Sequence, residues 1–381
     1  MPRPALPKRL VFVVLAVALG LLLLEGGLSA VWFVVDYVGF RDNLPVATDS
    51  PESHHARHDP DLGWVHVPDR ALRNFYGPDC HLTINKDGLR VSGDAATAAR
   101  AGPDDRFRLV CLGDSFTLGY GVDDRATYPA QLQKLNQRLQ TINMGQGGYS
   151  VGQCYLWYLR DGASFEPDAV LFAMIVDDIW RMAGTRMMNG FAMPQFVAEG
   201  GRLRISGQPV PDKIPTGHTL ERDSLLVPYF EQHTAIGRTV QRVVGSRAEP
   251  TGVEREQLVK VACRIIGELQ QQASRQRIGL VVVLLPELRE LRELGPRQDY
   301  LNVSNLLSDF ASRNGILLED LSRSFETLDP ETLDSYYLPE QWHHFSEAGN
   351  RYVAGQLDTI LSKSLDGYPK RKPVKRPGNE Q

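Results

Sequence analysis

The sequence contains only four cysteines in 381 residues, and no two of them form a CxxC pair. Cysteines without regular spacing predict neither a disulfide scaffold nor a zinc-binding cluster. Three histidines, His54, His55 and His58, lack an acidic or cysteine partner at a metal-site spacing, so we interpret them as part of a solvated loop. We therefore expect no metal and no cofactor.

Charge and motifs argue against two further classes of function. The formal net charge is −4 with both signs interspersed, which gives no indication of a nucleic-acid partner. No GxGxxG follows the first predicted strand, and no GxxxxGK followed by Ser or Thr occurs. A dinucleotide-binding fold and a P-loop therefore both lack support.

A long apolar stretch lies near the amino terminus. Residues 10–24 are apolar or glycine, and apolar character resumes over residues 28–35. As one helix, residues 10–35 would extend ~39 Å at ~1.5 Å per residue, which exceeds a bilayer core of ~30 Å. The sequence therefore predicts one membrane span.

The flanking charges predict the orientation of this span. Arg3, Lys8 and Arg9 precede it, so the positive-inside rule places the amino terminus in the cytoplasm and the chain after about residue 36 outside. A cleaved signal peptide is the alternative, but the best cleavage site, after Ala30, has Leu28 where a small residue is needed. We favour an uncleaved anchor.

Composition divides the chain into four predicted segments. Residues 1–40 hold the cytoplasmic start and the anchor, and residues 41–106 form an irregular extracytoplasmic lead-in. Residues 107–365 form an α/β domain with an insertion at 179–250, and residues 366–381 form a basic tail. Near the end of the lead-in, residues 81–84 are predicted as a short strand followed by a turn. Within the insertion, residues 202–210 are predicted as a small hairpin around Gly207.

Five predicted strands alternate with amphipathic helical segments through the α/β domain. Short apolar runs are typical of buried strands, and here they occupy residues 107–112, 169–176 and 279–285, while residues 141–144 and 316–318 are predicted as short strands. Strands alternating with helices predict a parallel sheet with helices on both faces. We expect a three-layer αβα sandwich with a flavodoxin-like five-stranded sheet, preceded by the transmembrane helix.

Residues that could take part in catalysis follow the first three predicted strands. The motif GDSF, residues 113–116, can hold the Ser115 Oγ at the carboxyl edge of the sheet, where ligands bind in open α/β folds. Gly148 follows the second strand, two aspartates at 177–178 follow the third, and two histidines at 343–344 come late in the chain. A nucleophilic serine needs a base, an orienting group for that base, and donors for the oxyanion. These residues predict acyl transfer.

Over residues 105–365 the chain resembles the SGNH/GDSL hydrolases, with motifs in the family's order. The resemblance implies that Ser115 is the nucleophile, that His344 is the base, and that the Gly148 N–H is an oxyanion donor. The motifs concerned are GDSF at 113–116, NMGQGGYS at 143–150, VDD at 176–178 and HFSEAGN at 344–350.

Asp177 departs from the family pattern, because it stands where the family has an oxyanion-binding asparagine. An ionised carboxylate repels a developing oxyanion, and the loss of one donor costs about 10²–10³ in rate. Burial beside Asp178 would raise the pKa of one member of this pair, which could allow Asp177 to donate as a protonated acid. We expect Asp114 and Asp178 to support the site residues.

The acid that orients the base is the second departure. The family's DxxH becomes QWHH at 341–344, so Glu340 is one residue out of register for His344 and correctly spaced for His343. We prefer His344, because the FSxxGN pattern from residue 345 keeps the family's spacing. Glu340 or Asp334 then orients the base, or the serine and histidine work as a dyad.

The motifs DLGW at 61–64 and NKDGLR at 85–90, together with the anchor, resemble the membrane-anchored bacterial members, which act on acyl groups of exported polysaccharide or envelope glycans. The resemblance implies a single-pass inner-membrane protein whose catalytic domain faces the periplasm or the cell exterior. It would be a serine esterase or O-acyltransferase for an acylated glycan or small ester, with envelope or polysaccharide-secretion proteins as partners. Whether water or a sugar accepts the acyl group is left open.

Two alternatives are kept. One is a catalytically degenerate member that binds glycan or a secretion partner without turnover, which Asp177 and the displaced acid motivate. The other is a lipid-directed esterase, which requires that the insertion form an apolar cleft.

Overall fold

The computed structural model describes residues 55–92, 106–185, 191–200, 202–211, 252–339 and 344–365, together with scattered positions among the first 34. The chain divides into two units, residues 1–50 with 215–249, and residues 51–214 with 250–381. All the elements discussed below belong to the second unit.

The predicted anchor falls almost wholly outside this description. Of residues 10–35, only 12–17, 19–20, 30 and 34 are described, and residues 12–17 are helical. Within the described part of the chain, no helix has the length and apolar character needed to cross a membrane. The predicted basic tail, residues 366–381, also lies outside the described residues.

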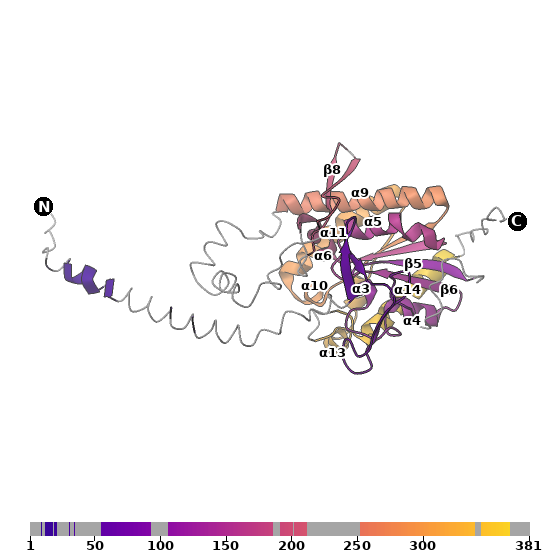
Figure 1. Ribbon diagram of the computed structural model, residues 1–381, viewed down its shortest axis with the longest axis horizontal. Helices are drawn as coiled ribbons and strands as arrows, with labels where there is room; N and C mark the ends of the chain where they lie inside the picture. The colour runs from indigo at the N-terminus through magenta and orange to yellow at the C-terminus, as the bar shows by residue number, and fades with distance from the viewer. Residues whose placement is uncertain are drawn as a thin grey trace. The chain divides into compact units, whose positions relative to one another are not determined.

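A sheet of five parallel strands forms the centre of the second unit (Figure 1). Its order is β11-β10-β7-β5-β6, and its strands are β5 (Phe107–Gly113), β6 (Leu139–Gly145), β7 (Ala169–Met174), β10 (Gly279–Leu284) and β11 (Leu317–Asp320). In chain order this is 2-1-3-4-5, the flavodoxin-like arrangement. The five predicted strands and their parallel pairing are confirmed.

Helices pack on both faces of the sheet (Figure 1). One core contains side chains from α5 (Val151–Arg160), α9 (Gly252–Gln276) and α11 (Leu294–Asn314), and the other contains side chains from α4 (Tyr128–Leu135) and α14 (Glu347–Leu365). Successive residues of β5 alternate between these cores, as the two-residue period of a strand requires. The three-layer αβα architecture is therefore confirmed.

Shorter helical segments connect these layers. They are α3 (Ser115–Leu118), α6 (Val176–Trp180), α10 (Leu288–Arg292), α12 (Ser322–Phe325) and α13 (Pro330–Ser335), with 3-10 turns η1 (Gly162–Phe165) and η2 (Arg181–Ala183). α3 directly follows β5, and α6 follows β7 after a single residue, so both lie at the carboxyl edge of the sheet.

Side-chain caps fix where several helices begin. The Thr127 hydroxyl accepts a hydrogen bond from the N–H of Ala130 at the start of α4, and the Ser346 hydroxyl accepts one from Gly349 at the start of α14. Ser150 and Gln153 form a capping box at the start of α5. Local sequence therefore sets these boundaries.

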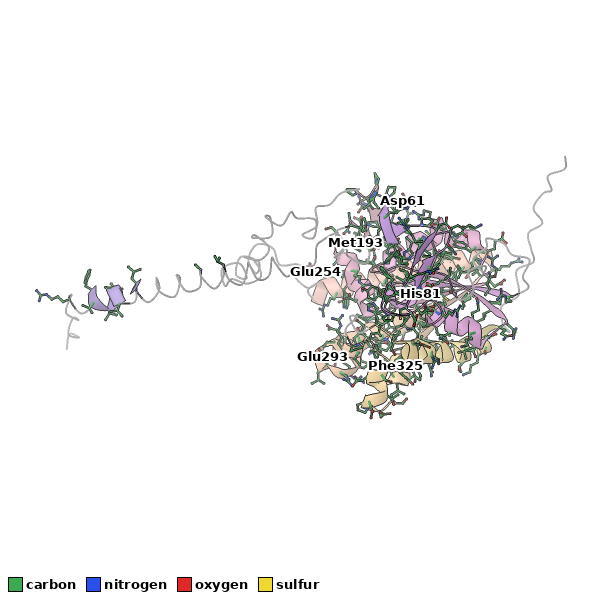
Figure 2. All side chains as sticks on the ribbon, turned by 60° about the horizontal axis from the view of Figure 1, so that its bottom comes forward. Asp61, His81, Met193, Glu254, Glu293 and Phe325 are labelled. Carbon is green, nitrogen blue, oxygen red and sulfur yellow. The ribbon has the colours of Figure 1, made fainter. Side chains whose placement is uncertain are left out.

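The lead-in is more ordered than its sequence suggests. Instead of being irregular, residues 55–92 form two antiparallel pairs, β1 (Ala56–Asp59) with β2 (Gly63–His66) and β3 (Arg70–Leu72) with β4 (Leu82–Ile84). Figure 2 labels Asp61, in the turn between β1 and β2, and His81, just before β4. Strands of three or four residues carry too little alternation to be recognised from sequence, although the strand predicted at 81–84 is present.

The hairpin of the insertion is displaced from its predicted position. It is formed by β8 (Gln195–Glu199) and β9 (Arg202–Ser206), which pair antiparallel and project beyond α9 (Figure 1). Its turn lies at Gly200, which has φ +56°, whereas Gly207 follows the second strand. The sequence has a glycine at both positions, 200 and 207, and the prediction that the turn lies at Gly207 is wrong. Residues 212–250 of the insertion lie outside the described residues.

Candidate active site

Ser115 lies at the sharp turn where β5 ends and α3 begins. The Asp114 carboxylate caps this turn by accepting a hydrogen bond from the N–H of Phe116 at 2.9 Å. Gly113 is required here, because a Cβ at this position would lie 2.1 Å from Thr117 Oγ1. The turn places Ser115 at the carboxyl edge of the sheet with 7% of its surface exposed.

His344 reaches this serine from the loop before α14. Its Nε2 lies 2.7 Å from the Ser115 Oγ, across 229 positions of the sequence. The imidazole packs against Phe116 and Tyr120, with ring centroids 4.7 and 4.9 Å away. The fold thus brings together the two residues predicted as nucleophile and base.

The loop after β6 lies against the same turn. Gln146 donates its N–H to the Gly113 carbonyl at 3.2 Å. A Cβ on Gly145 would lie 2.0 Å from the Leu118 nitrogen of α3, so only glycine allows this approach. Gly148 follows with φ +75°, in the left-handed region that favours glycine. The predicted oxyanion residue therefore sits in a loop that touches the serine turn.

Arg181 connects the serine turn, the Gly148 loop and the end of β7, and our reading of the sequence did not single it out. Its Nη1 donates to Asp114 Oδ2 at 3.0 Å, to the Tyr149 carbonyl at 3.1 Å, and to Asp178. The spacing was an available signal, because Arg181 stands four residues after Asp177 and three after Asp178, within reach on a helical turn.

Asp178 is the buried member of the aspartate pair. It is 1% exposed, and its Oδ2 accepts a hydrogen bond from the N–H of Ile175 at 3.1 Å. Burial, together with the neighbouring Asp114, raises the pKa of Asp178 well above its usual range. For Arg181 burial acts to lower the pKa, but Asp178 and Asp114 outweigh it and the pKa is raised. Asp178 and Asp114 thus pack against one guanidinium behind the serine turn.

Asp177 has a different environment. Its side chain is 38% exposed and lies 3.2 Å from Arg181 Nη2 and 3.6 Å from Arg289 Nη2. Two guanidinium groups therefore offset the negative charge of Asp177.

Of the candidates for the orienting acid, the structure describes only Asp334. Its side chain is 52% exposed and forms an ion pair with Arg292. Glu340 and His343 lie outside the described residues.

Arg90, the last residue of the NKDGLR motif, supports the chain beyond α3. It is 1% exposed, and its Nε donates to Asp124 at 2.9 Å. Its four remaining N–H groups are directed to the carbonyls of His81, Leu118, Gly119 and Val122, at 2.6–2.9 Å. All five donors of this guanidinium are used.

His55 and His58 of the predicted solvated loop both contact other parts of the chain. His55 is 1% exposed, and its Nδ1 lies 3.2 Å from Nδ1 of His66. His58 Nε2 lies 2.8 Å from the Val210 carbonyl, while His54 is outside the described residues. The prediction is wrong for His55 because the β1–β2 pair buries it.

The chain resembles known hydrolases. The model of the GDSL-like Lipase/Acylhydrolase family matches residues 111–352. Among solved structures, the lipase/acylhydrolase from Enterococcus faecalis matches with 14% identity and a TM-score of 0.38, over 71% of this chain and 100% of its own. A catalytic mutant of an acetylxylan esterase from Geobacillus stearothermophilus matches with 14% identity and a TM-score of 0.40, over 70% of this chain and 96% of its own. Another acetyl xylan esterase matches with 19% identity and a TM-score of 0.40, over 67% and 100%. No curated protein matches.

Proposed function

The chain belongs to the GDSL-like lipase/acylhydrolase family, and from this premise we propose that it is a membrane-anchored serine esterase or O-acyltransferase for acylated exported polysaccharide or envelope glycan. Membership of this family identifies the chain as an ester-hydrolysing serine hydrolase. The observation that carries the assignment of roles is the 2.7 Å contact between Ser115 Oγ and His344 Nε2.

In the proposed reaction, Ser115 transfers its hydroxyl proton to His344 Nε2 as Oγ attacks the ester carbonyl carbon. The N–H groups of Ser115 and Gly148 stabilise the oxyanion that forms. The intermediate collapses to an acyl-enzyme, and His344 returns the proton to the leaving alcohol. Water or a sugar hydroxyl then loses its proton to His344 and attacks the acyl group. As the acyl–Oγ bond breaks, His344 returns this proton to Ser115 Oγ, which restores the free enzyme.

Aromatic rings beside the base support a carbohydrate substrate. Tyr120 lies 4.9 Å from His344 between ring centroids, and Tyr76 lies 4.9 Å from Tyr120. Both tyrosines are partly exposed. Aromatic rings suit a sugar, which presents C–H groups on one face, and the Tyr76 hydroxyl itself is buried, so the contact offered by Tyr76 is its ring.

The location of the protein is part of the proposal. The apolar stretch at residues 10–35, with three basic residues before it, supports a single-pass anchor in the inner membrane. The motifs DLGW and NKDGLR support the same group of bacterial proteins, whose substrates lie outside the cytoplasm. A secretion complex for polysaccharide is the partner that this location favours.

The proposal is tested with the full-length chain in mild detergent, treated with p-nitrophenyl acetate and a fluorophosphonate probe. We expect ester hydrolysis and covalent labelling in the wild type, loss of both in Ser115→Ala, and no change in Ser164→Ala, which removes an exposed hydroxyl. Labelling of Ser115→Ala at the wild-type rate would contradict the nucleophile. A folded wild type that neither hydrolyses nor labels would favour the glycan-binding alternative.

A second assay separates hydrolysis from transfer and tests the substrate. Acetyl-labelled p-nitrophenyl acetate is supplied with an exported polysaccharide that has been chemically deacetylated. Label on the polysaccharide indicates an O-acyltransferase, and label released as free acetate indicates an esterase. Failure of the enzyme both to acetylate the polysaccharide and to deacetylate its native form would contradict the glycan substrate.

A further inference from the structure

Trp64 of the DLGW motif contacts the loop that carries Gly148, although residues 55–92 lie outside the stretch that matches the family. The Trp64 side chain is buried, and its indole Nε1–H donates to the Gly147 carbonyl at 3.0 Å. The Tyr149 hydroxyl donates in return to the Trp64 carbonyl. The residues on both sides of Gly148 are therefore tied to one tryptophan.

The first of these contacts fixes a peptide plane. The Gly147 carbonyl and the Gly148 N–H belong to the same peptide unit, and in a trans peptide these two groups point in opposite directions. Because Trp64 holds the carbonyl, the Gly148 N–H is directed away from the indole. Within the described part of the chain, no residue accepts a hydrogen bond from this N–H.

This peptide needs an external constraint. Gly147 and Gly148 are both free of a Cβ, so neither side chain opposes a rotation of the peptide between them. A rotation would exchange the positions of donor and acceptor and would present a carbonyl oxygen to the oxyanion. A hydrogen bond to the carbonyl also polarises the N–H on the other side of the unit.

The indole itself is firmly held. Its ring packs against Tyr149 and Phe191, with centroids 5.3 and 5.9 Å away. The preceding turn is anchored by Gln153 of α5, whose Nε2 donates to the Leu62 carbonyl at 2.7 Å. β2 therefore presents the indole N–H from a fixed position.

We propose that Trp64 is a positioning residue for the oxyanion hole, which it serves by locking the peptide between Gly147 and Gly148 with its N–H toward the reacting ester. The inference rests on the proposed ester chemistry and assigns a catalytic contribution to the DLGW motif. It also makes the lead-in part of the working enzyme.

The kinetic test compares Trp64→Phe with Trp157→Phe in the full-length protein. Both substitutions keep an aromatic ring and remove one indole donor. Trp157 is a matched control, because its ring also lies near Tyr149, at 5.7 Å, while its Nε1 donates to Asp161. We expect kcat for p-nitrophenyl acetate to fall about 10- to 100-fold in Trp64→Phe, below the full effect of about 10²–10³ for a lost donor.

Three further readouts separate positioning from a general structural role. KM should stay within about twofold of wild type, since an oxyanion interaction is made in the transition state. The pH inflection of kcat should stay in place, because Trp64 does not contact His344. Urea unfolding should shift similarly in both variants, since each loses one hydrogen bond.

An NMR experiment tests the hydrogen bond to the Gly147 carbonyl directly and does not require an active enzyme. With glycine alone labelled at its carbonyl carbon and nitrogen, a carbonyl–nitrogen correlation spectrum shows only Gly-Gly pairs, of which the sequence has three, at 26–27, 147–148 and 200–201. Substitutions Gly26→Ala and Gly200→Ala identify the other two. We expect the Gly147 carbonyl signal to move upfield in Trp64→Phe and to stay in place in Trp157→Phe.

Equal kcat values in the two variants, or an unmoved Gly147 signal in Trp64→Phe, would overturn the inference. A wild type inactive toward every ester would contradict the proposed function instead. The carbonyl signal would still decide whether Trp64 holds this peptide, so the two failures are distinguishable.

Discussion

Arg181 Nη2 lies 3.2 Å from the carboxylate of Asp177, the residue that the sequence resemblance places where the SGNH/GDSL family has an asparagine. The same guanidinium binds Asp114 and Asp178 through Nη1, and Arg289 approaches Asp177 from α10. The Asp177 carboxylate thus forms ion pairs with both arginines. In the proposed reaction, these ion pairs would reduce the repulsion between the Asp177 carboxylate and the oxyanion, although they supply no donor.

Replacing Asp177 with asparagine should therefore raise activity. Asparagine removes the remaining negative charge and offers an N–H to the oxyanion. We expect kcat for p-nitrophenyl acetate to rise roughly tenfold, about 1.4 kcal/mol of barrier, less than the about 10²–10³ for a complete donor because two arginines already offset the charge.

The control for this prediction is Asp177→Ala, which removes the charge without adding a donor. A rise in Asp177→Asn alone would identify the amide as the cause, and an equal rise in both would identify the lost charge. A fall in both variants would show that the ion pairs with Arg181 and Arg289 contribute more than the donor would.

Strong local patterns made much of the fold predictable. The strands β7 and β10 stood out because each is a continuous apolar run, β5 interrupts its run only at Arg108, and the parallel order of the sheet followed from the alternation with helices. The placement of Ser115 and the Gly148 loop at one sheet edge followed from the same alternation, since the carboxyl ends of parallel strands meet there. Bringing His344 to that edge required only that the last helix pack beside α4.

Long-range pairing was the part that sequence could not supply. Strands as short as β1 and β2 have no visible period, and the burial of His55 depends on a partner, His66, that no local pattern indicates. The hydrogen bonds of the Arg90 guanidinium depend on carbonyls from residues 81 to 122, which only the folded chain brings together. The role of Trp64 depends in the same way on a contact across 83 positions.

The orienting acid of His344 is tested by a pair of substitutions. Asp334 is engaged with Arg292, so Asp334→Asn should leave kcat unchanged. Glu340→Gln should lower kcat about 10²-fold, at the low end of what general-base assistance contributes. Steady-state kinetics on p-nitrophenyl acetate measures both. Wild-type rates in both variants would instead indicate a Ser115–His344 dyad.

Arg90 should be among the most costly residues to remove. Arg90→Gln would leave Asp124 without its buried partner and several carbonyls without donors, so we expect a loss of about 3–5 kcal/mol in the free energy of unfolding. Arg160→Gln is the matched control, because Arg160 also pairs with an aspartate, Asp59, but is 32% exposed. Its loss should be about 1 kcal/mol. Equal midpoints in urea for the two variants would contradict this ranking.

The histidine pair of the lead-in predicts a loss of stability in mild acid. His66 Nε2 lies 3.0 Å from the Gly145 carbonyl, which can only accept, so Nε2 carries the proton and Nδ1 accepts from His55. A second proton on His66 would have no place in this contact. Burial lowers its pKa from 6.5 to about 4.

The sign of the effect follows from this shift. Above pH 6.5 His66 is neutral in both the folded and the unfolded chain, and it imposes no penalty. Between pH 6.5 and about 4 His66 is protonated in the unfolded chain and still neutral in the folded protein, so the free energy of unfolding falls, by roughly 3 kcal/mol in total.

The test uses His66→Gln, in which the amide nitrogen can still reach the Gly145 carbonyl and this position no longer titrates. Urea unfolding at pH 7.5 and pH 4.5 should therefore show the variant less stable than wild type at the higher pH and closing or reversing that gap at the lower. A gap that stays constant between the two pH values would mean that His66 takes up its proton as readily in the folded protein as in the unfolded chain.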